Sequence, residues 1–217
     1  TRKSYEQMIR LHIRPALGSI KLVELTAQHV RQVLSSKKSL STRTIQYIRA
    51  IIKASLSDAM SLELIDRNVA SLVKIAAPVR DIPNPWTVDE IRRFFAEAQG
   101  HRLEALFHTA IYTGARQGEL LALEWSDVDL ENGQLIINKT INTIDGVHIV
   151  HTPKSKTSNR KVFLSPQAVK KLAEHRSRQW EERLASPRWD DEYDLVFASH
   201  TGTPIDPANA RRILSNI

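Results

Sequence analysis

A glycine between two apolar repeats constrains the fold of this 217-residue chain more than any other feature. Upstream of Gly114, apolar residues recur at spacings of three and four, which predicts one buried face of a helix: Leu103, Leu106, Phe107, Ala110 and Ile111. Glycine ends helices readily because it adopts a left-handed backbone at little cost. A second helix is expected to begin at once and to carry Glu119 through Glu124. The pattern therefore predicts a helix–turn–helix junction.

Arg116 lies at this junction, and Glu119 follows three residues later on the same helical face. A carboxylate in that position can hold an arginine so that the planar guanidinium offers paired N–H donors to a phosphate. The other interpretation is an ordinary surface ion pair, and the spacing alone favours it.

The longer string around Arg116 resembles the first-arginine motif of the tyrosine recombinases, the phage integrase family. Members of that family typically read T-G-x-R-x-x-E-L-x-x-L-x-W-x-D. The positions that match here are Thr113, Gly114, Arg116, Glu119, Leu120, Leu123, Trp125 and Asp127. The resemblance implies that Arg116 is a catalytic residue at the cleaved DNA phosphate and that Glu119 supports it.

A basic segment, residues 152–160, lies between two apolar stretches that predict strands, Val147–Thr152 and Lys161–Leu164. A basic hairpin tip is commonly a solvated edge and nothing more. The segment also resembles the family pattern P-K-T-x-x-S-x-R, in which a lysine on a β-hairpin reaches the cleavage site. Lys154 matches that catalytic lysine. Lys156 is the alternative catalytic lysine. If the strand pairing is shifted by two residues, Lys156 takes the place of Lys154 on the same face of the sheet.

The positive charge is concentrated near the beginning of the chain. Residues 1–80 hold 14 Lys and Arg against 5 Asp and Glu, whereas residues 81–217 hold 17 against 19. The chain as a whole has a formal net charge of +7. This asymmetry points to nucleic-acid binding concentrated in the first third.

Several helices are expected in this basic third. Residues 4–14 predict a helix with Met8 and Leu11 turned inward, and Ser41 or Thr42 is expected to cap a longer helix. The apolar stripe of that longer helix comprises Ile45, Ile48, Ile52, Leu56, Ala59 and Met60.

The pattern from Leu40 to Asn68 resembles the core-binding domain of the same integrases, which clamps the DNA duplex. The candidate DNA contacts on the polar side of this helix are Thr42, Arg43, Tyr47, Arg49 and Lys53. Simple solvation is the other interpretation of such a basic face.

Prolines mark a boundary, because Pro78, Pro83 and Pro85 disfavour helix and favour an extended linker. We expect a helical core-type DNA-binding domain at 1–76, a linker at 77–85 and a partial catalytic domain at 86–217. The expected fold is mainly α with a small antiparallel β-sheet, an α+β catalytic domain truncated at its C-terminus. A hairpin around Asn132-Gly133 begins the sheet, and residues 167–185 predict an amphipathic helix through Val169, Leu172, Trp180 and Leu184.

The remaining family motifs, a His-x-x-Arg pair, a later His or Trp and the tyrosine nucleophile, have no match. The surroundings of the four tyrosines do not fit a nucleophile motif: Tyr5, Tyr47, Tyr112 and Tyr193. The chain is thus expected to be an integrase fragment that is inactive alone.

The resemblance implies site-specific DNA recombination or integration through a phosphotyrosine intermediate, without metal or other cofactor. It also implies double-stranded DNA as the partner, a tetramer of the full-length protein on that DNA, and a bacterial or phage origin. The absence of cysteine suits the cytoplasm, and no apolar run approaches the ~20 residues that span a bilayer. Two alternatives remain: a non-catalytic DNA-binding module, and a metal-dependent nuclease using Asp127, Asp129 or the acidic residues at 190–194.

Overall fold

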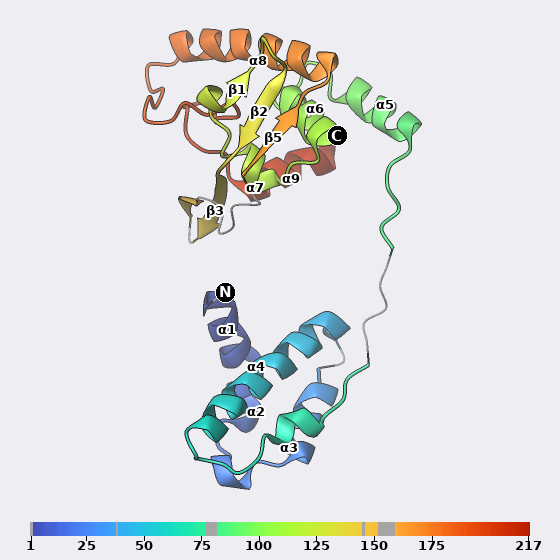
Figure 1. Ribbon diagram of the computed structural model, residues 1–217, viewed down its shortest axis with the longest axis vertical. Helices are drawn as coiled ribbons and strands as arrows, with labels where there is room; N and C mark the ends of the chain where they lie inside the picture. Colours follow the sequence, from blue (N-terminus) through green and yellow to red (C-terminus); the bar gives the residue numbers. More distant parts are fainter. Residues whose placement is uncertain (1, 38, 77–81, 145, 152–158) are drawn as a thin grey trace. The chain divides into compact units, whose positions relative to one another are not determined.

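The chain forms two compact units, Thr1–Asn84 and Pro85–Ile217, in a computed structural model (Figure 1). The structure describes residues 2–37, 39–76, 82–144, 146–151 and 159–217. Each unit has a hydrophobic core of its own, as expected for parts that fold independently. In this described part, no helix is both long enough and apolar enough to cross a membrane.

The first unit begins with a helical stretch that changes its winding. Helix α1 (Arg2–Met8) leads into a π-helical turn, η1 (Ile9–Ile13), and then into α2 (Arg14–Leu17). A π turn pairs residues five apart, so it rotates the faces that follow relative to a regular α-helix. Leu11, which the sequence pattern placed inward, is consequently 48% exposed, while residues further along pack on the core: Ile13 and Leu17.

The rest of the first unit is a small bundle of capped helices. After the short 3-10 turn η2 (Leu22–Glu24) come α3 (Ala27–Ser35), α4 (Thr42–Ser61) and the 3-10 turn η3 (Val69–Leu72). Ser41 caps α4 by accepting the backbone N–H of Thr44 at 3.2 Å, so Ser41 is the N-cap and Thr42 is the first helical residue.

Most of the apolar stripe expected on α4 is buried as predicted, from Ile48 through Ala59. Met60 at its end is exposed, however, and Ile51 is buried in its place. The core of this unit is formed by Val30, Leu34, Ile48, Ile52, Leu56, Val69, Ala70 and Val73.

The second unit is mainly helical, and its elements are α5 (Val88–Glu97), α6 (Glu104–Thr113), α7 (Gln117–Leu120), the 3-10 turn η4 (Trp125–Asp127), α8 (Pro166–Ala185) and α9 (Pro207–Asn216). Thr87 and Ser165 cap α5 and α8, because their hydroxyls accept the backbone N–H three residues on, at 3.3 and 3.2 Å. Helix α6 packs against α8, and the core between the elements contains Leu106, Leu121, Leu135, Leu172, Val196 and Phe197.

The strands form two separate antiparallel sheets, whereas a single sheet was expected. Strands β1 (Val128–Asp129), β2 (Gln134–Ile137) and β5 (Arg160–Phe163) pair in the order β1-β2-β5. The hairpin between β1 and β2 turns at Asn132-Gly133, where Gly133 has a φ of 60°, which confirms that prediction. Strands β3 (Thr140–Ile144) and β4 (Val147–His151) form the second sheet.

Helix α8 spans nearly the expected residues, but the side chains that it buries are not all those predicted. Trp180 and Leu184, predicted inward, are 51% and 83% exposed. Two polar side chains are buried on that helix instead, His175 and Gln179. They are accommodated because they hydrogen-bond backbone carbonyls of residues 195 and 196, which satisfies them in the interior.

Candidate functional site

The site forms where α6 ends, and its geometry begins with Gly114. The backbone of Gly114 is left-handed, with a φ of 60°, and its N–H donates to the carbonyl of Ala110. The hydroxyl of Thr113 donates to the carbonyl of Thr109 and accepts the N–H of Ala115. These bonds confirm the predicted helix end and turn the chain so that Arg116 precedes the first residue of α7.

The second helix is shorter than the sequence pattern indicated. Helix α7 contains only Gln117–Leu120, and Glu124 lies beyond it in extended backbone. The chain leaves the helix because it pairs with a later segment: the N–H of Val196 donates to the carbonyl of Leu123, and the N–H of Trp125 donates to the carbonyl of Asp194. Arg116 is therefore fixed by one helical turn and by its partners.

Glu119 is the central residue of this arrangement. Its side chain is only 7% exposed, and its carboxylate accepts four hydrogen bonds. Two come from Arg116, from the backbone N–H at 2.9 Å and from Nη1 at 2.9 Å. The other two come from Arg160, from Nη1 at 3.2 Å and from Nη2 at 2.7 Å. A carboxylate has about four acceptor positions, so Glu119 is saturated.

The two arginines lower the pKa of Glu119 to about 2, with the hydrogen bonds from Arg160 as the largest cause. Burial acts in the opposite direction, and the backbone N–H and side chain of Arg116 contribute further lowering. The pKa of Arg160 is raised by the same contact. Glu119 is therefore ionised at neutral pH, and with the two arginines it leaves one net positive charge at the site.

Arg116 differs from Arg160 in being open to solvent. The side chain of Arg116 is 78% exposed, against 33% for Arg160. Among the residues that the structure describes, the only side-chain hydrogen bond of Arg116 is the one to Glu119. A guanidinium has several further N–H donors; those of Arg116 have no acceptor within the described ranges and can bind an anion.

Two neighbouring residues attach α7 to the rest of the unit. Gly118 approaches β3 so closely that a Cβ would lie 2.7 Å from Oγ1 of Thr140 and 2.8 Å from the carbonyl oxygen of Ile141. Gln117 donates from Nε2 to the carbonyl of Pro207 at 2.8 Å and accepts from Arg211 at 3.1 Å. The helix that presents Arg116 is thereby held between β3 and α9.

Lys154 and Lys156 lie outside the described residues, so their position relative to Arg116 remains a prediction. The strands on either side of them belong to different sheets, because β4 pairs with β3 and β5 pairs with β2. In the described part of the chain, β4 and β5 do not pair, and the expected hairpin of these two strands is in that respect wrong. The reason is that β3, a strand that the sequence pattern missed, takes β4 as its partner.

Arg160 is the site residue that the sequence reasoning missed. It occupies the last position of the basic pattern P-K-T-x-x-S-x-R, so a signal was present in the motif. Its partner Glu119 is 41 residues away, a separation that no local periodicity can reveal.

Comparison with known proteins identifies the family. The phage integrase family matches residues 86–217, and the phage integrase N-terminal SAM-like domain matches residues 1–38. This chain belongs to the phage integrase family, the tyrosine recombinases. An integrase of Streptomyces ambofaciens is 31% identical over 207 residues, a match that covers 93% of this chain and 53% of that protein. The chain spans about half the length of the curated relatives it matches.

Solved structures show that the fold is that of a tyrosine recombinase. The Tn1549 transposon integrase in complex with a circular intermediate DNA superposes with a TM-score of 0.82 at 18% identity, covering 99% of this chain and 70% of that one. A lambda integrase tetramer bound to a Holliday junction superposes with a TM-score of 0.68 at 19% identity. That match covers 99% of this chain and 58% of the lambda integrase chain. The prediction of a mainly helical tyrosine-recombinase fold with a small antiparallel β-sheet is confirmed, except that the strands divide into two sheets.

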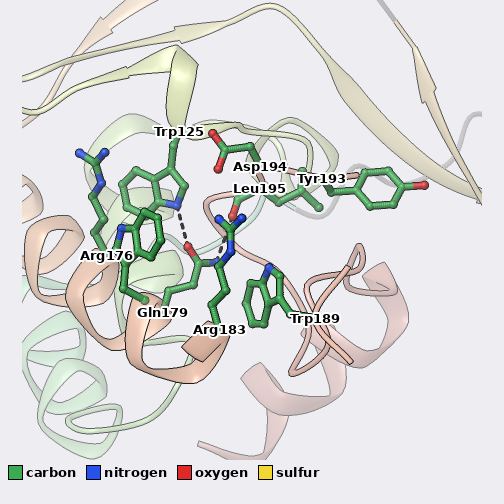
Figure 2. A pocket seen from close by; sticks show the side chains of 9 residues that line it. Trp125, Arg176, Gln179, Arg183, Trp189, Tyr193, Asp194 and Leu195 are labelled. Carbon is green, nitrogen blue, oxygen red and sulfur yellow. Dashed lines mark hydrogen bonds between the residues drawn. The ribbon is translucent and has the colours of Figure 1, made fainter. Parts of the chain in front are cut away.

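In this integrase-family chain the motif tryptophan has a packing role. Trp125 lines a pocket of about 220 Å³ and donates from Nε1 to Oε1 of Gln179 at 2.6 Å (Figure 2). The guanidinium of Arg176 lies 5.2 Å from the centre of the Trp125 ring, within the range of a cation–π contact. These contacts attach η4, and with it the end of the arginine motif, to α8.

The five candidate DNA contacts all lie on α4 of the integrase-family chain. Residues spaced by seven and eleven share a face, which groups Thr42 with Arg49 and Lys53, while Arg43 and Tyr47 lie on the neighbouring face. The Tyr47 ring is 5.7 Å from that of Tyr5. Nε of Arg49 is buried without a hydrogen-bond partner among the described residues.

The structure also bears on the metal-nuclease alternative. Across the described ranges, no three His, Asp or Glu side chains come together in a group that could hold a metal ion. Asp127 instead accepts a hydrogen bond from Asn138 at 2.7 Å, and Asp129 accepts two from Asn132 in the β1–β2 turn. These two carboxylates are thus engaged in local structure.

Proposed function

We propose that this chain is part of a site-specific recombinase that cuts and rejoins double-stranded DNA through a phosphotyrosine intermediate. The observation that carries the proposal is the exposed Arg116 guanidinium, held by the buried carboxylate of Glu119 in a member of the phage integrase family. In the proposed step a tyrosine oxygen attacks a phosphodiester, a 3′-phosphotyrosine bond forms, and the bond to the 5′-oxygen breaks.

Arg116 has the properties that such a step needs. Negative charge grows on the non-bridging phosphoryl oxygens in the transition state, and a planar guanidinium can bind two of them at once. Because Glu119 already fixes its orientation, Arg116 loses little freedom when the charge develops. The step needs no metal or nucleotide cofactor, since the phosphodiester energy is kept in the covalent bond to tyrosine.

Lys154 is the proposed donor of the proton to the leaving 5′-oxygen, and Lys156 is the alternative. A lysine ammonium can release a proton in this way, whereas an arginine cannot. Both lysines precede Arg160, which is bound to the same carboxylate as Arg116.

The proposed partner is double-stranded DNA, held by two modules. Residues 1–76 would contact the backbone through the α4 residues, and residues 86–217 would handle the cleaved phosphate, with 77–85 as the linker. The net formal charge of +9 over residues 1–80 supports this division. The lambda integrase tetramer on a Holliday junction supports a tetramer of the full-length protein on DNA.

The test is strand cleavage by the full-length protein. Arg116→Ala should abolish the covalent protein–DNA adduct formed on a nicked suicide substrate but lower DNA affinity only slightly, because Arg116 makes one phosphate contact among many in the bound state and most of its contribution in the transition state. Arg92→Ala, which removes an exposed arginine of α5, is the matched control and should cleave normally. Adduct formation by Arg116→Ala at the wild-type rate would refute the proposal.

The lysine assignment has a separate test. Lys154→Ala should slow cleavage of a normal phosphodiester far more than cleavage of a substrate with a 5′-thiolate leaving group, which needs no proton. If the 5′-thiolate substrate restored cleavage by Lys156→Ala but not by Lys154→Ala, Lys156 would be the proton donor instead of Lys154. If neither variant is rescued, the general-acid role is wrong for both lysines.

A non-catalytic DNA-binding module is the second candidate, and the charge asymmetry alone supports it. Under either function, Arg43→Gln and Lys53→Gln should each lower the slope of log affinity against log salt by about one unit. Lys170→Gln, an exposed change in the second unit, should leave the slope unchanged. Salt-dependent DNA binding by a full-length protein that forms no covalent adduct would favour this second candidate.

A further inference from the structure

Arg160 and Arg116 share the carboxylate of Glu119. Both terminal nitrogens of Arg160 donate to the carboxylate, at 3.2 and 2.7 Å, one to each oxygen. Arg116 uses the same two oxygens, Oε2 through its backbone and Oε1 through its side chain. The orientation of the Glu119 carboxylate, and through it that of the Arg116 guanidinium, therefore depends on Arg160.

The backbone of Arg160 is itself fixed by the three-stranded sheet. Arg160 is the first residue of β5, where it is opposite Ile137 of β2 in the antiparallel register. Ile137 is buried in the core of the unit. Arg116, in contrast, lies at a turn before a four-residue helix. The ion pair thus connects the turn that presents Arg116, through Glu119, to a backbone position held by the sheet.

We propose that Arg160 is a positioning residue for Arg116, which keeps the guanidinium of Arg116 directed outward and open to a phosphate. This inference rests on the proposed role of Arg116 as a phosphate ligand. Arg116 rather than Arg160 is taken as the phosphate ligand, because the side chain of Arg116 is 78% exposed, whereas that of Arg160 is two-thirds covered and donates from both terminal nitrogens to Glu119.

The expected consequence of losing Arg160 follows from the hydrogen-bond capacity of Glu119. Without Arg160 the carboxylate would have two acceptor positions free and its full negative charge would act on Arg116. The Arg116 guanidinium would then turn to pair with both oxygens, the preferred bidentate geometry, and would withdraw donors from an incoming anion. Loss of Arg160 should therefore weaken anion binding at a residue that it does not touch.

The test uses the 217-residue chain and inorganic sulfate, a phosphate mimic whose charge is constant over the pH range used. Sulfate binding is followed by NMR at the Nε–Hε group of Arg116, assigned by its loss in Arg116→Ala. The variants are Arg160→Gln and Arg160→Lys. The matched control is Lys161→Gln, which removes the same charge from the next residue of β5.

In Arg160→Gln the affinity of Arg116 for sulfate should fall about tenfold at neutral pH, the loss expected when a charge-assisted hydrogen bond is misaligned. The affinity should recover on acidification, because the Glu119 pKa returns toward its ordinary 4.5 and protonation then releases Arg116. In the wild type and in Lys161→Gln the affinity should stay constant across the same range. A purely structural ion pair would not produce this pH-dependent recovery.

Arg160→Lys keeps the positive charge, but an ammonium donates from a single nitrogen. We therefore expect a loss of sulfate affinity smaller than that in Arg160→Gln. This variant decides the question if Arg160→Gln does not fold. Sulfate affinity within about twofold of wild type in a folded Arg160→Gln, or in Arg160→Lys where Arg160→Gln is unfolded, would overturn the inference. A wild-type Arg116 that does not respond to sulfate would instead refute the proposed role of Arg116 itself.

Discussion

Arg116 donates to the carboxylate of Glu119 twice, once from its backbone N–H and once from its guanidinium, both at 2.9 Å. The backbone bond caps the first turn of α7, and the side-chain bond orients the exposed cation. One buried carboxylate thus connects local folding to the presentation of a charge. The stability of this region and its anion binding should therefore change together when Glu119 changes.

The first prediction concerns the charge of Glu119. Its pKa in the folded chain, about 2, is below the ordinary 4.5, so its contribution to stability is complete above about pH 4.5 and is lost as the pH falls toward 2. That shift corresponds to about 3 kcal/mol. Glu119→Gln should lower the free energy of unfolding by about this amount at pH 7 and make it less dependent on pH in the acid range.

Urea titrations at neutral and acid pH measure this effect. Glu131→Gln, an exposed change in the β1–β2 turn, is the control and should behave like the wild type. Equal pH dependence in Glu119→Gln and in the wild type would show that another carboxylate is responsible.

The second prediction concerns the close approach of α7 to β3. Gly118→Ala places a methyl group against Oγ1 of Thr140 and the backbone of Ile141, so it should cost about 2 kcal/mol of unfolding free energy through overpacking. Adding Thr140→Ala removes one of the two clashes and should recover part of that loss. A fully stable Gly118→Ala single variant in a thermal denaturation experiment would contradict the observed approach.

Features determined by neighbouring residues could be predicted from the sequence. Gly114 ends α6 because a left-handed residue is needed there, and Thr87 and Ser165 cap helices because their hydroxyls reach N–H groups three residues on. The hairpin at Asn132-Gly133 depends on the same local turn preferences.

Features that depend on distant partners could not be predicted in this way. Gln179 and His175 are buried because carbonyls at 195 and 196 accept their hydrogen bonds, and as polar residues they are not counted in an apolar repeat although their spacing from Leu172 is helical. The π turn at Ile9–Ile13 shifts an apolar face without any marked change in composition. The contact between Glu119 and Arg160, the least local part of the site, is missed for the same reason.

The third prediction tests the polar contact behind the motif tryptophan. Gln179 accepts from Nε1 of Trp125 and donates to the carbonyls of Leu195 and Val196 at 3.0 and 3.2 Å. Gln179→Leu takes this partner from the indole N–H of Trp125 and the carbonyl of Leu195, while the carbonyl of Val196 keeps its hydrogen bond to His175. The variant should therefore cost about 2 kcal/mol of unfolding free energy. Glu181→Leu, an exposed change on the same helix, is the matched control and should cost much less. If urea titrations gave nearly equal losses of unfolding free energy for the two variants, the hydrogen bonds of Gln179 would not be what stabilises this region.

The last prediction concerns His108, a buried histidine outside the candidate site. Its ring stacks on Phe95 with 3.7 Å between centroids and 4° between planes. Nδ1 is buried without a hydrogen-bond partner in the described part of the chain, and Nε2 is 3.9 Å from Oε1 of Glu104. Glu104 has better partners, the ammonium of Lys171 at 2.8 Å and the N–H of Gly100 at 3.0 Å. The histidine can therefore be replaced without leaving this carboxylate unpaired.

Burial lowers the pKa of His108 below its ordinary 6.5, against an opposing effect of Glu104. The stability linked to its neutral form is therefore complete above about pH 6.5 and is lost as the pH falls below that value. His108→Phe keeps the stacked ring and removes the unpaired nitrogen, so it should leave the free energy of unfolding unchanged or raise it by about 1 kcal/mol at pH 7. It should also reduce the loss of stability on mild acidification. The loss that remains is expected from His175, whose pKa is lowered by burial too.

Urea titrations at pH 7 and at mildly acid pH measure both effects, with the exposed His200→Phe as control. Marked destabilisation of His108→Phe at pH 7 would show instead that the weak contact with Glu104 stabilises the fold.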